Sequence, residues 1–272
     1  MTTTSHAAND ELARITSHPD PRVKAIGEAL LAAMARVFSP EERHWIGLIE
    51  QRRAQLLASS QVIPVIDYGA GRPDSRRSRE EMEQGVPSSA EIRAICGASK
   101  PPFWASLLMK LIVGLKPSSC LELGSCVGIS ASYMGAALQG NRGGRLTSLE
   151  GSPEVARIAR ETLGSLGIGS VDVVTGPFHK TLAGVMQSAG PIDFFFNDGH
   201  HDHDAVLGYF EQALPHLADN SVMVLDDIGW SEGMRKAWAS IAGDSRVRAS
   251  IDLGAIGIVV INRKSTFAVR IS

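Results

Sequence analysis

The stretch that most constrains the fold is residues 118–137, which read SSCLELGSCVGISASYMGAA. A short apolar run contains one acid, Glu122, and is followed by Gly124, by Gly128 and then by good helix formers. This order is typical of a β-strand, a tight glycine turn and an α-helix. Glycine permits a turn where a Cβ would clash, and the free N–H groups at the helix start can face a polar ligand. The stretch therefore predicts a βα unit that can hold a ligand.

The spacing of the glycines separates the candidate ligands. A dinucleotide-binding turn has the pattern G-x-G-x-x-G, but Cys126 and Ile129 stand where its second and third glycines would be. The pattern present is acid-x-Gly-x-x-x-Gly, which resembles the first motif of the class I S-adenosylmethionine (SAM)-dependent methyltransferases. In that family the carboxylate lies near the cationic methionine end of SAM, and the loop backbone passes beneath it. The structural alternative is an ordinary βα turn, which many α/β proteins contain.

Composition narrows the class of protein. Of the 272 residues, 44% are hydrophobic and 21% are charged, which is typical of a globular protein with a full core. The formal net charge of −2 gives no indication of a nucleic-acid or membrane partner. The three cysteines form no C-x-x-C pair, and no signal peptide or bilayer-spanning run of roughly 18 apolar residues is present. We therefore expect a cytoplasmic protein with reduced thiols.

Strand-like and helix-like segments alternate along the second half of the chain. Strands followed by helices are predicted at 120–123, 145–149, 171–174, 192–196 and 221–225, and strand-like runs without helices at 247–251, 255–261 and 268–271. Repeated βα units imply a parallel sheet with right-handed crossovers. The pattern resembles the methyltransferase sheet. We therefore predict an α/β fold with a Rossmann-like, doubly wound, seven-stranded, mostly parallel sheet and an antiparallel C-terminal edge.

The first hundred residues lack this alternation. Residues 22–36 and 41–59 carry apolar side chains at helical spacing. Residues 61–71 resemble a second glycine turn, but Pro64 interrupts the would-be strand and the charged run that follows reads as a solvated loop. We expect residues 1–100 to form an N-terminal helical extension, either a lid, a homodimer contact or mere packing helices. Residues 101–272 would form the SAM-binding domain.

Acids and other polar residues lie at the ends of four of the predicted parallel strands, at 122–128, Glu150, 198–201 and 226–227. In an open α/β sheet, ligands bind outside the carboxyl ends of the strands, so we expect these acids at one rim. Glu150 follows Gly128 by 22 residues, an interval at which an acid accepts hydrogen bonds from ribose hydroxyls. SAM and NAD share that ribose. An exposed glutamate at a helix start is the structural alternative.

Two polar runs follow the fourth and fifth of these strands. Residues 197–204 read NDGHHDHD, but the zinc pattern H-x-H-x-D-H fails because Ala205 and Val206 replace its last two ligands. Asp226 and Asp227 are adjacent carboxylates, which repel each other unless a cation or hydrogen-bond donors neutralise them. With Asp198 they would offer three oxygen ligands to Mg²⁺. Alternatively, one aspartate caps the next helix and the other is solvated.

These runs resemble two motifs of the metal-dependent O-methyltransferases of the class I SAM-binding superfamily. Residues 198–201 fit D-G-x-H and residues 226–227 fit D-D, as in the macrocin type, and Trp230 resembles the caffeoyl-CoA type. The resemblance covers roughly residues 103–261 and implies that residues 175–178 line the adenine pocket. Phe178 would stack on the base there or belong to the core. The lysine that catalyses the reaction in the catechol type is missing after the fourth strand, where His201 and His203 stand instead.

The resemblance implies methyl transfer from SAM to a hydroxylated small molecule. Mg²⁺ on Asp198, Asp226 and Asp227 would acidify and orient the hydroxyl, and the catalytic pair would be Asp198 with His201 as the general base. The residues expected to bind SAM are Glu122, Gly124, Ser125, Cys126, Gly128, Ser130, Glu150, Gly151, Ser152, Gly176, Pro177, Phe178 and Asp198.

Two other functions stay open at this point. The first is a nicotinamide-dependent oxidoreductase, against which the broken dinucleotide pattern argues. The second is a non-catalytic SAM-binding protein, against which the carboxylate cluster argues. The sequence leaves the methyl acceptor open, since a catechol, a sugar hydroxyl, a polyketide and a peptide all fit it.

Overall fold

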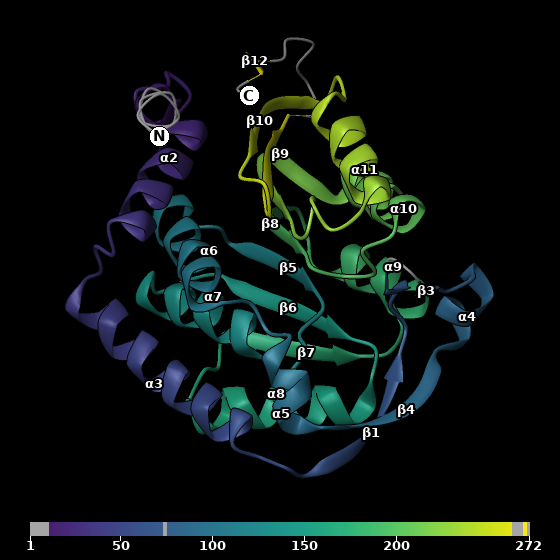
Figure 1. Cartoon of the computed structure of the whole chain (residues 1–272). Helices are drawn as coiled ribbons and strands as arrows, with labels where there is room; N and C mark the ends of the chain where they lie inside the picture. The colour runs from purple at the N-terminus through teal and green to yellow at the C-terminus, as the bar shows by residue number, and fades with distance from the viewer. Residues whose placement is uncertain (1–10, 73–74, 263–268, 271–272) are drawn as a thin grey trace, which may run out of the picture.

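A computed structural model of the chain describes residues 11–72, 75–262 and 269–270. Its main sheet has the strand order β12-β10-β11-β9-β8-β5-β6-β7 (Figure 1). The strands are β5 (Ser119–Leu123), β6 (Arg145–Glu150), β7 (Val171–Thr175), β8 (Ile192–Asn197), β9 (Leu217–Leu225), β10 (Val247–Asp252), β11 (Gly257–Ile261) and β12 (Val269–Arg270).

The direction of the strands confirms the predicted sheet. Strands β7, β6, β5, β8 and β9 run parallel, whereas β11 is antiparallel to both β9 and β10. The two-residue β12 adds a short parallel pairing beside β10. The strand-like run predicted at 268–271 lies partly outside the described residues. Parallel strands that are buried on both faces read as continuous apolar runs, and Phe194, Phe195 and Phe196 of β8 are fully buried.

Helices cover both faces of this sheet, as a doubly wound fold requires. The helices are α2 (Pro21–Met34), α3 (Pro40–Leu57), α4 (Arg79–Gln84), α5 (Ile92–Gly97), α6 (Pro102–Leu115), α7 (Ile129–Gly140), α8 (Pro153–Ser165), α9 (Phe178–Ser188), α10 (His203–Ala213), the 3₁₀ turn η1 (Leu214–His216) and α11 (Glu232–Ala242). None of the described helices is both long and apolar enough to cross a membrane.

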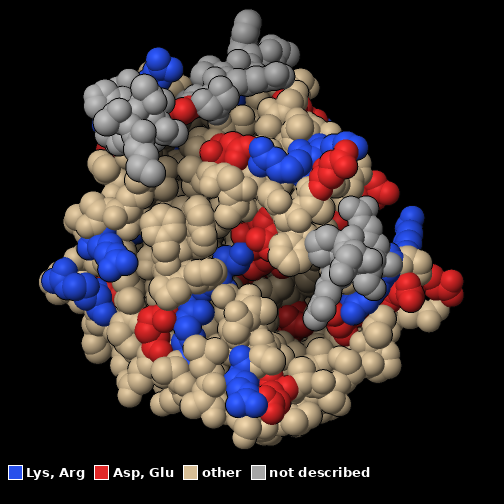
Figure 2. All heavy atoms as spheres, in the orientation of Figure 1, with Lys and Arg blue, Asp and Glu red and all other residues tan. Residues whose placement is uncertain are grey.

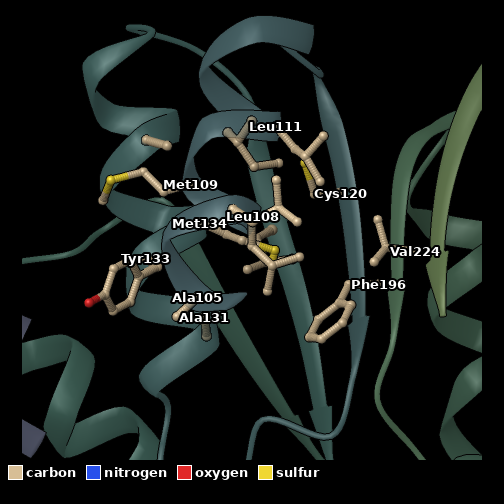
Figure 3. Close-up of a cluster of buried hydrophobic side chains, with 14 of the residues drawn as sticks. Ala105, Leu108, Met109, Leu111, Cys120, Ala131, Tyr133, Met134, Phe196 and Val224 are labelled. Atoms are coloured by element: carbon tan, nitrogen blue, oxygen red, sulfur yellow. The ribbon is translucent and has the colours of Figure 1, made fainter. Parts of the chain in front are cut away.

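Two hydrophobic clusters lie on the two faces of the sheet. One joins the sheet to α2, α3, α6, α7 and α8, and the other joins it to α9, α10 and α11. Figure 3 shows part of the first cluster, which includes Leu108 and Leu111 of α6, Met134 of α7 and Phe196 of β8. Because side chains alternate along a strand, Phe194 and Phe196 enter this cluster while Phe195 enters the other.

The first hundred residues share the first cluster. Ile26 of α2 and Ile49 of α3 are fully buried in it, and a capping box between Ser39 and Glu42 begins α3. Residues 1–10 of the predicted extension lie outside the described residues. The division of the chain at residue 100 stays a prediction.

This region is less helical than predicted. Strand β1 (Val62–Asp67) pairs antiparallel with β4 (Val86–Glu91), with Pro64 opposite Ser89. The prediction that Pro64 excludes a strand was wrong, because a two-stranded ribbon leaves one edge of β1 unpaired and proline is tolerated there. The charged run between them contains β2 (Gly71–Arg72), β3 (Ser75–Arg76) and α4, so it is not simply a loop. In Figure 1 the ribbon lies beyond the arrowheads of the parallel strands.

Candidate functional site

The carboxyl ends of four neighbouring parallel strands bring the predicted acids to one rim. Glu122 is on β5, Glu150 ends β6, and Asp198 and Asp226 directly follow β8 and β9. These strands are adjacent in the order β9-β8-β5-β6. Figure 2 shows acidic and basic atoms side by side at a hollow on this face of the molecule. The rim is therefore a charged concavity at the place where an open α/β sheet binds its ligands.

The glycine loop after β5 is fixed by two close approaches. Gly124 has φ 91°, and a Cβ there would lie 2.5 Å from the carbonyl oxygen of Asp198. Gly128 has φ 87°, and a Cβ there would lie 3.1 Å from Ala159 Cα in α8. Gly124 thus lets the loops after β5 and β8 meet. Gly128 lets α7 begin close to α8, so helix packing explains this glycine, whereas the sequence suggested a close approach to the ligand.

Glu122 lies beneath this loop and is fully buried. Its carboxylate accepts hydrogen bonds from Ser130 Oγ, at 2.6 Å, and from Ser148 Oγ, which also contacts Ser125 Oγ. Burial raises the pKa of Glu122 to about 7, although the two serine hydrogen bonds oppose this shift. Glu122, Ser125 and Ser130 were predicted to bind the cofactor. In this structure all three are buried and belong, with Ser148, to one hydrogen-bonded network under the loop.

Glu150 joins the loops after β5 and β6. Its carboxylate accepts hydrogen bonds from the backbone N–H groups of Cys126 and Ser152, both at 3.0 Å. Burial raises the pKa of Glu150 to about 7, against the effect of these hydrogen bonds. Part of the surface of Glu150 is nevertheless exposed to solvent, so the residue is only half-buried. A carboxylate has about four acceptor positions, so Glu150 keeps some that can face a ligand.

Residues of the N-terminal region pack beside Glu150, a contact that the sequence did not predict. The ring of Tyr68, just after β1, lies so close to Gly151 that a Cβ there would be 2.5 Å from it. Ser152, which is buried, accepts a hydrogen bond from the backbone N–H of Ile66 at 3.2 Å. Gly151 and Ser152 therefore contact the β1–β4 ribbon. Tyr68 was missed because β1 itself was rejected.

The loop after β7 holds the next predicted residues. Gly176 has φ 140°, and its N–H donates to the Glu150 carbonyl oxygen at 2.9 Å. Pro177 precedes α9. Phe178 is buried in the second cluster, edge-on to the rings of His200 and Tyr209 at 5.3 and 5.9 Å. The hypothesis that Phe178 stacks on adenine is therefore replaced by its alternative, a core residue.

The histidines after β8 separate into different environments. His200 is packed against Phe178, its Nδ1 contacts the hydroxyl of Tyr209, and burial lowers its pKa to about 4. His203 lies at the start of α10 and pairs with Asp204. His201 alone of the three lies at the rim, where its Nε2 is 3.7 Å from Asp198 Oδ1 and 3.8 Å from Asp227 Oδ2. His201 and Asp198, the two residues predicted to be catalytic, therefore lie close together in the structure.

A lysine that sequence reasoning missed lies between the aspartates. Lys100 precedes α6, and its side chain forms an ion pair with Asp226 and lies 4.0 Å from Asp198 Oδ2. Asp226 is 1% exposed, and its Oδ1 has no hydrogen-bond partner among the described residues. Burial raises the pKa of Asp198 to about 6, while Lys100 and His201 act to lower it and Asp227 to raise it. No local pattern could have indicated Lys100, which is 126 residues from Asp226.

The predicted magnesium centre is not assembled from these aspartates. Among the described residues, no group of three or more His, Cys, Asp or Glu side chains is arranged to hold a metal ion. Asp226 already has an ammonium group as its counter-ion, and Asp227 has φ 50° and lies beside His201. Asp198, Asp226 and Asp227 therefore do not fit a resident Mg²⁺ in this structure, because a cation of the chain itself neutralises the site.

Comparisons with known proteins agree with this fold. Residues 121–228 match the family model described as a methyltransferase domain. No curated protein sequence matches the chain. Many solved structures share its fold, at low sequence identity.

Three of these structures show the extent of the similarity. An O-methyltransferase from Bacillus cereus in complex with SAH is 24% identical, with a TM-score of 0.54 over 62% of this chain and 85% of that one. The O-methyltransferase TomG from Streptomyces achromogenes, in complex with SAM, is 22% identical, with a TM-score of 0.51 over 60% and 82%. Cofactor-bound Rv0187 from MTB is 18% identical, with a TM-score of 0.52 over 90% and 99%. The family match over residues 121–228 and the fold shared with these structures support a class I SAM-dependent methyltransferase domain that resembles the O-methyltransferases.

Proposed function

We propose that this methyltransferase transfers the methyl group of SAM to a hydroxyl oxygen of a small molecule. The observation that carries the proposal is the pairing of His201 with Asp198 at the rim, 3.7 Å apart, beside the glycine loop. A hydroxyl must lose its proton to become a good nucleophile, and an imidazole held near a carboxylate can take that proton. An amine or a thiolate acceptor needs such a base less.

The cofactor half of the site fits SAM. Gly124 keeps the loop after β5 free of a side chain, and Glu150 retains acceptor positions for ribose hydroxyls at the end of β6. Bound there, SAM would supply an electrophilic methyl group on a sulfonium. The residues of the chain that we assign to holding it are Gly124, Cys126, Glu150, Gly151 and Gly176.

The acceptor half of the site performs the proton transfer. His201 Nε2 accepts the proton of the acceptor hydroxyl as the oxygen attacks the methyl group. Asp198 stabilises the imidazolium that results, because its Oδ1 lies at ion-pair distance from Nε2. Removing either group would take away the base or the carboxylate that stabilises it, so we expect both to be needed for rapid turnover.

The ribose assignment is tested by SAM binding measured by calorimetry. Glu150→Ala should weaken SAM affinity about tenfold or more, since it removes charge-assisted hydrogen bonds to two hydroxyls. Glu154→Ala is the matched control, because Glu154 lies in the first turn of α8 and, among the described residues, pairs only with Arg157. Equal SAM affinity in Glu150→Ala and wild type would remove the assignment.

The reaction itself is tested by methyl transfer from labelled SAM to a panel of hydroxylated, amino and thiol compounds. Label in methyl ethers supports the proposal, whereas label confined to amines or thiols contradicts it. SAM binding without turnover of any acceptor would favour a non-catalytic binding protein. Tight NADH binding in a fluorescence titration would favour an oxidoreductase.

A further inference from the structure

We infer that Lys100 takes the position of a divalent cation, so that methyl transfer is metal-independent and the lysine ammonium is the positive charge that faces the acceptor oxygen. The first half of this inference concerns ion binding alone. The second half rests on the proposed O-methyl transfer. The experiments below keep the two apart.

The position of the ammonium group is the first argument. Lys100 is 9% exposed, its Nζ is ion-paired with Asp226, and it lies 4.0 Å from Asp198 Oδ2. These two carboxylates follow adjacent strands, β8 and β9, and are the oxygen ligands that the sequence assigned to a metal. A cation bound between them would lie a few ångströms from a like charge, which strongly opposes its binding.

The attachment of Lys100 to the fold is the second argument. The Arg53 Nη2 group donates to the carbonyl oxygen of Lys100 at 2.9 Å, and Arg53 is itself buried and paired with Glu50. Pro101 and Pro102 follow, and their rings restrict the backbone where α6 begins. Lys100 is therefore held by its main chain on one side and by Asp226 on the other, unlike a surface lysine that moves freely.

The buried aspartate is the third argument. Asp226 is 1% exposed, and Oδ1 lacks a partner among the described residues, so the carboxylate depends on Lys100 for compensation. A buried carboxylate without a counter-ion is strongly disfavoured. The lysine therefore meets the same electrostatic need that would otherwise call for a metal.

The arrangement also explains how a fixed cation could assist the reaction. The two oxygens of Asp198 face different partners, since Oδ1 is 3.7 Å from His201 Nε2 and Oδ2 is 4.0 Å from Lys100 Nζ. An ammonium group has three N–H donors, and Asp226 takes one of them. The acceptor hydroxyl gives its proton to His201, and its oxygen forms the new bond to the methyl carbon as the sulfur–methyl bond of SAM breaks. Lys100 keeps its protons and stabilises the negative charge that builds on that oxygen.

Ion binding tests the first half without any enzyme assay. Mn²⁺ affinity is measured by electron paramagnetic resonance for wild type, Lys100→Ala and Lys100→Gln. We expect both variants to bind Mn²⁺ at least about tenfold more tightly than wild type, because a like charge has been removed from beside two carboxylates. Lys110→Met is the matched control, since Lys110 is also a largely buried lysine, paired with Glu42 at 2.8 Å, and should leave Mn²⁺ affinity as in wild type.

Equal Mn²⁺ affinity of wild type and both Lys100 variants, whether tight or weak, would overturn the inference. Circular dichroism shows whether each variant is folded before its ion binding is compared. Lys100→Gln keeps a polar side chain only one atom shorter than lysine, so it answers the question if Lys100→Ala does not fold.

Turnover tests the second half with an acceptor found in the methyl-transfer screen. We expect EDTA to leave the wild-type rate unchanged and Lys100→Gln to lower kcat about 100-fold with little change in the KM for SAM. Lys110→Met should keep the wild-type kcat. Loss of wild-type turnover in EDTA, restored by Mg²⁺, would overturn the metal-independent role. If no acceptor is methylated, the proposed function fails. The Mn²⁺ measurement still tests whether Lys100 occupies the position of a divalent cation.

Discussion

Glu122 and Asp226 are two fully buried acids of the same sheet rim, but they are neutralised in opposite ways. Glu122, on the proposed cofactor half, accepts hydrogen bonds from the neutral hydroxyls of Ser130 and Ser148, and its pKa rises to about 7. Asp226, on the proposed acceptor half, has the ammonium group of Lys100 as its partner. Neutral donors suit a region that binds and orders a nucleoside. Fixed opposite charges suit a region where a proton leaves an oxygen.

The largest expected effect comes from removing the cation of the acceptor half. Lys100→Met should lower the free energy of unfolding by about 3–5 kcal/mol, because it leaves a buried carboxylate without its counter-ion. Urea denaturation measures the loss. The double variant Lys100→Met/Asp226→Asn should recover much of it. If the double variant is as unstable as Lys100→Met, loss of the ion pair is not the cause of the instability. The proposed difference between Glu122 and Asp226 is then contradicted.

The next effect is a pH dependence that belongs to the cofactor half. The folded protein holds a proton on Glu122 up to about pH 7, whereas the unfolded chain releases it near pH 4.5. Between these values stability falls as pH rises, by about 3 kcal/mol in all. In Glu122→Gln this contribution is absent, so its stability relative to wild type should increase from pH 5 to pH 8. Chemical denaturation at both pH values measures the change.

The matched control for that experiment is Glu154→Gln, on the outside of α8. Its stability relative to wild type should be nearly the same at the two pH values. If Glu122→Gln behaves like this control, the pKa of Glu122 is not raised in the folded protein. The proposed difference between the two halves of the site is then contradicted.

The smallest effect concerns one hydroxyl under the glycine loop. Ser130→Ala removes one of the two side-chain donors to Glu122 and should cost about 2 kcal/mol at pH 8, with a smaller cost at pH 5, where a protonated carboxyl needs the donor less. Ser132→Ala on the same helix is the control, since the Ser132 hydroxyl donates to the Gly128 carbonyl oxygen and does not touch Glu122. Its cost should not change with pH. The same pH response in both variants would contradict the role of Ser130.

The sequence predicts well what local patterns determine. The apolar run at Phe194–Phe196 and the polar residues after it place β8 and the start of its loop, and the same reasoning places β9 and Asp226. Chain topology then carries these strand ends to one rim. The alternation of apolar runs and helices also determines the order of the layers.

The residues that were missed depend on contacts between distant segments. Lys100, which precedes α6, pairs with Asp226. Tyr68 contacts Gly151 from just after β1, a strand that was not predicted because it contains Pro64. The role of Phe178 depends on whether a ring turns to the core or to the rim, which spacing along the chain does not decide. The magnesium site stays a prediction that the structure does not support, because the three aspartates were read without Lys100, a cation that comes from another part of the fold.

The contact of Tyr68 and Ile66 with Gly151 and Ser152 joins the entrance of the proposed nucleoside pocket to the β1–β4 ribbon. If filling that pocket strengthens the docking of the ribbon, then undocking the ribbon must lower the affinity for the nucleoside by the same factor. The amide hydrogen of Ile66, which is bonded across this junction, should then exchange with solvent more slowly when the pocket is filled, and would report occupancy from outside the catalytic centre.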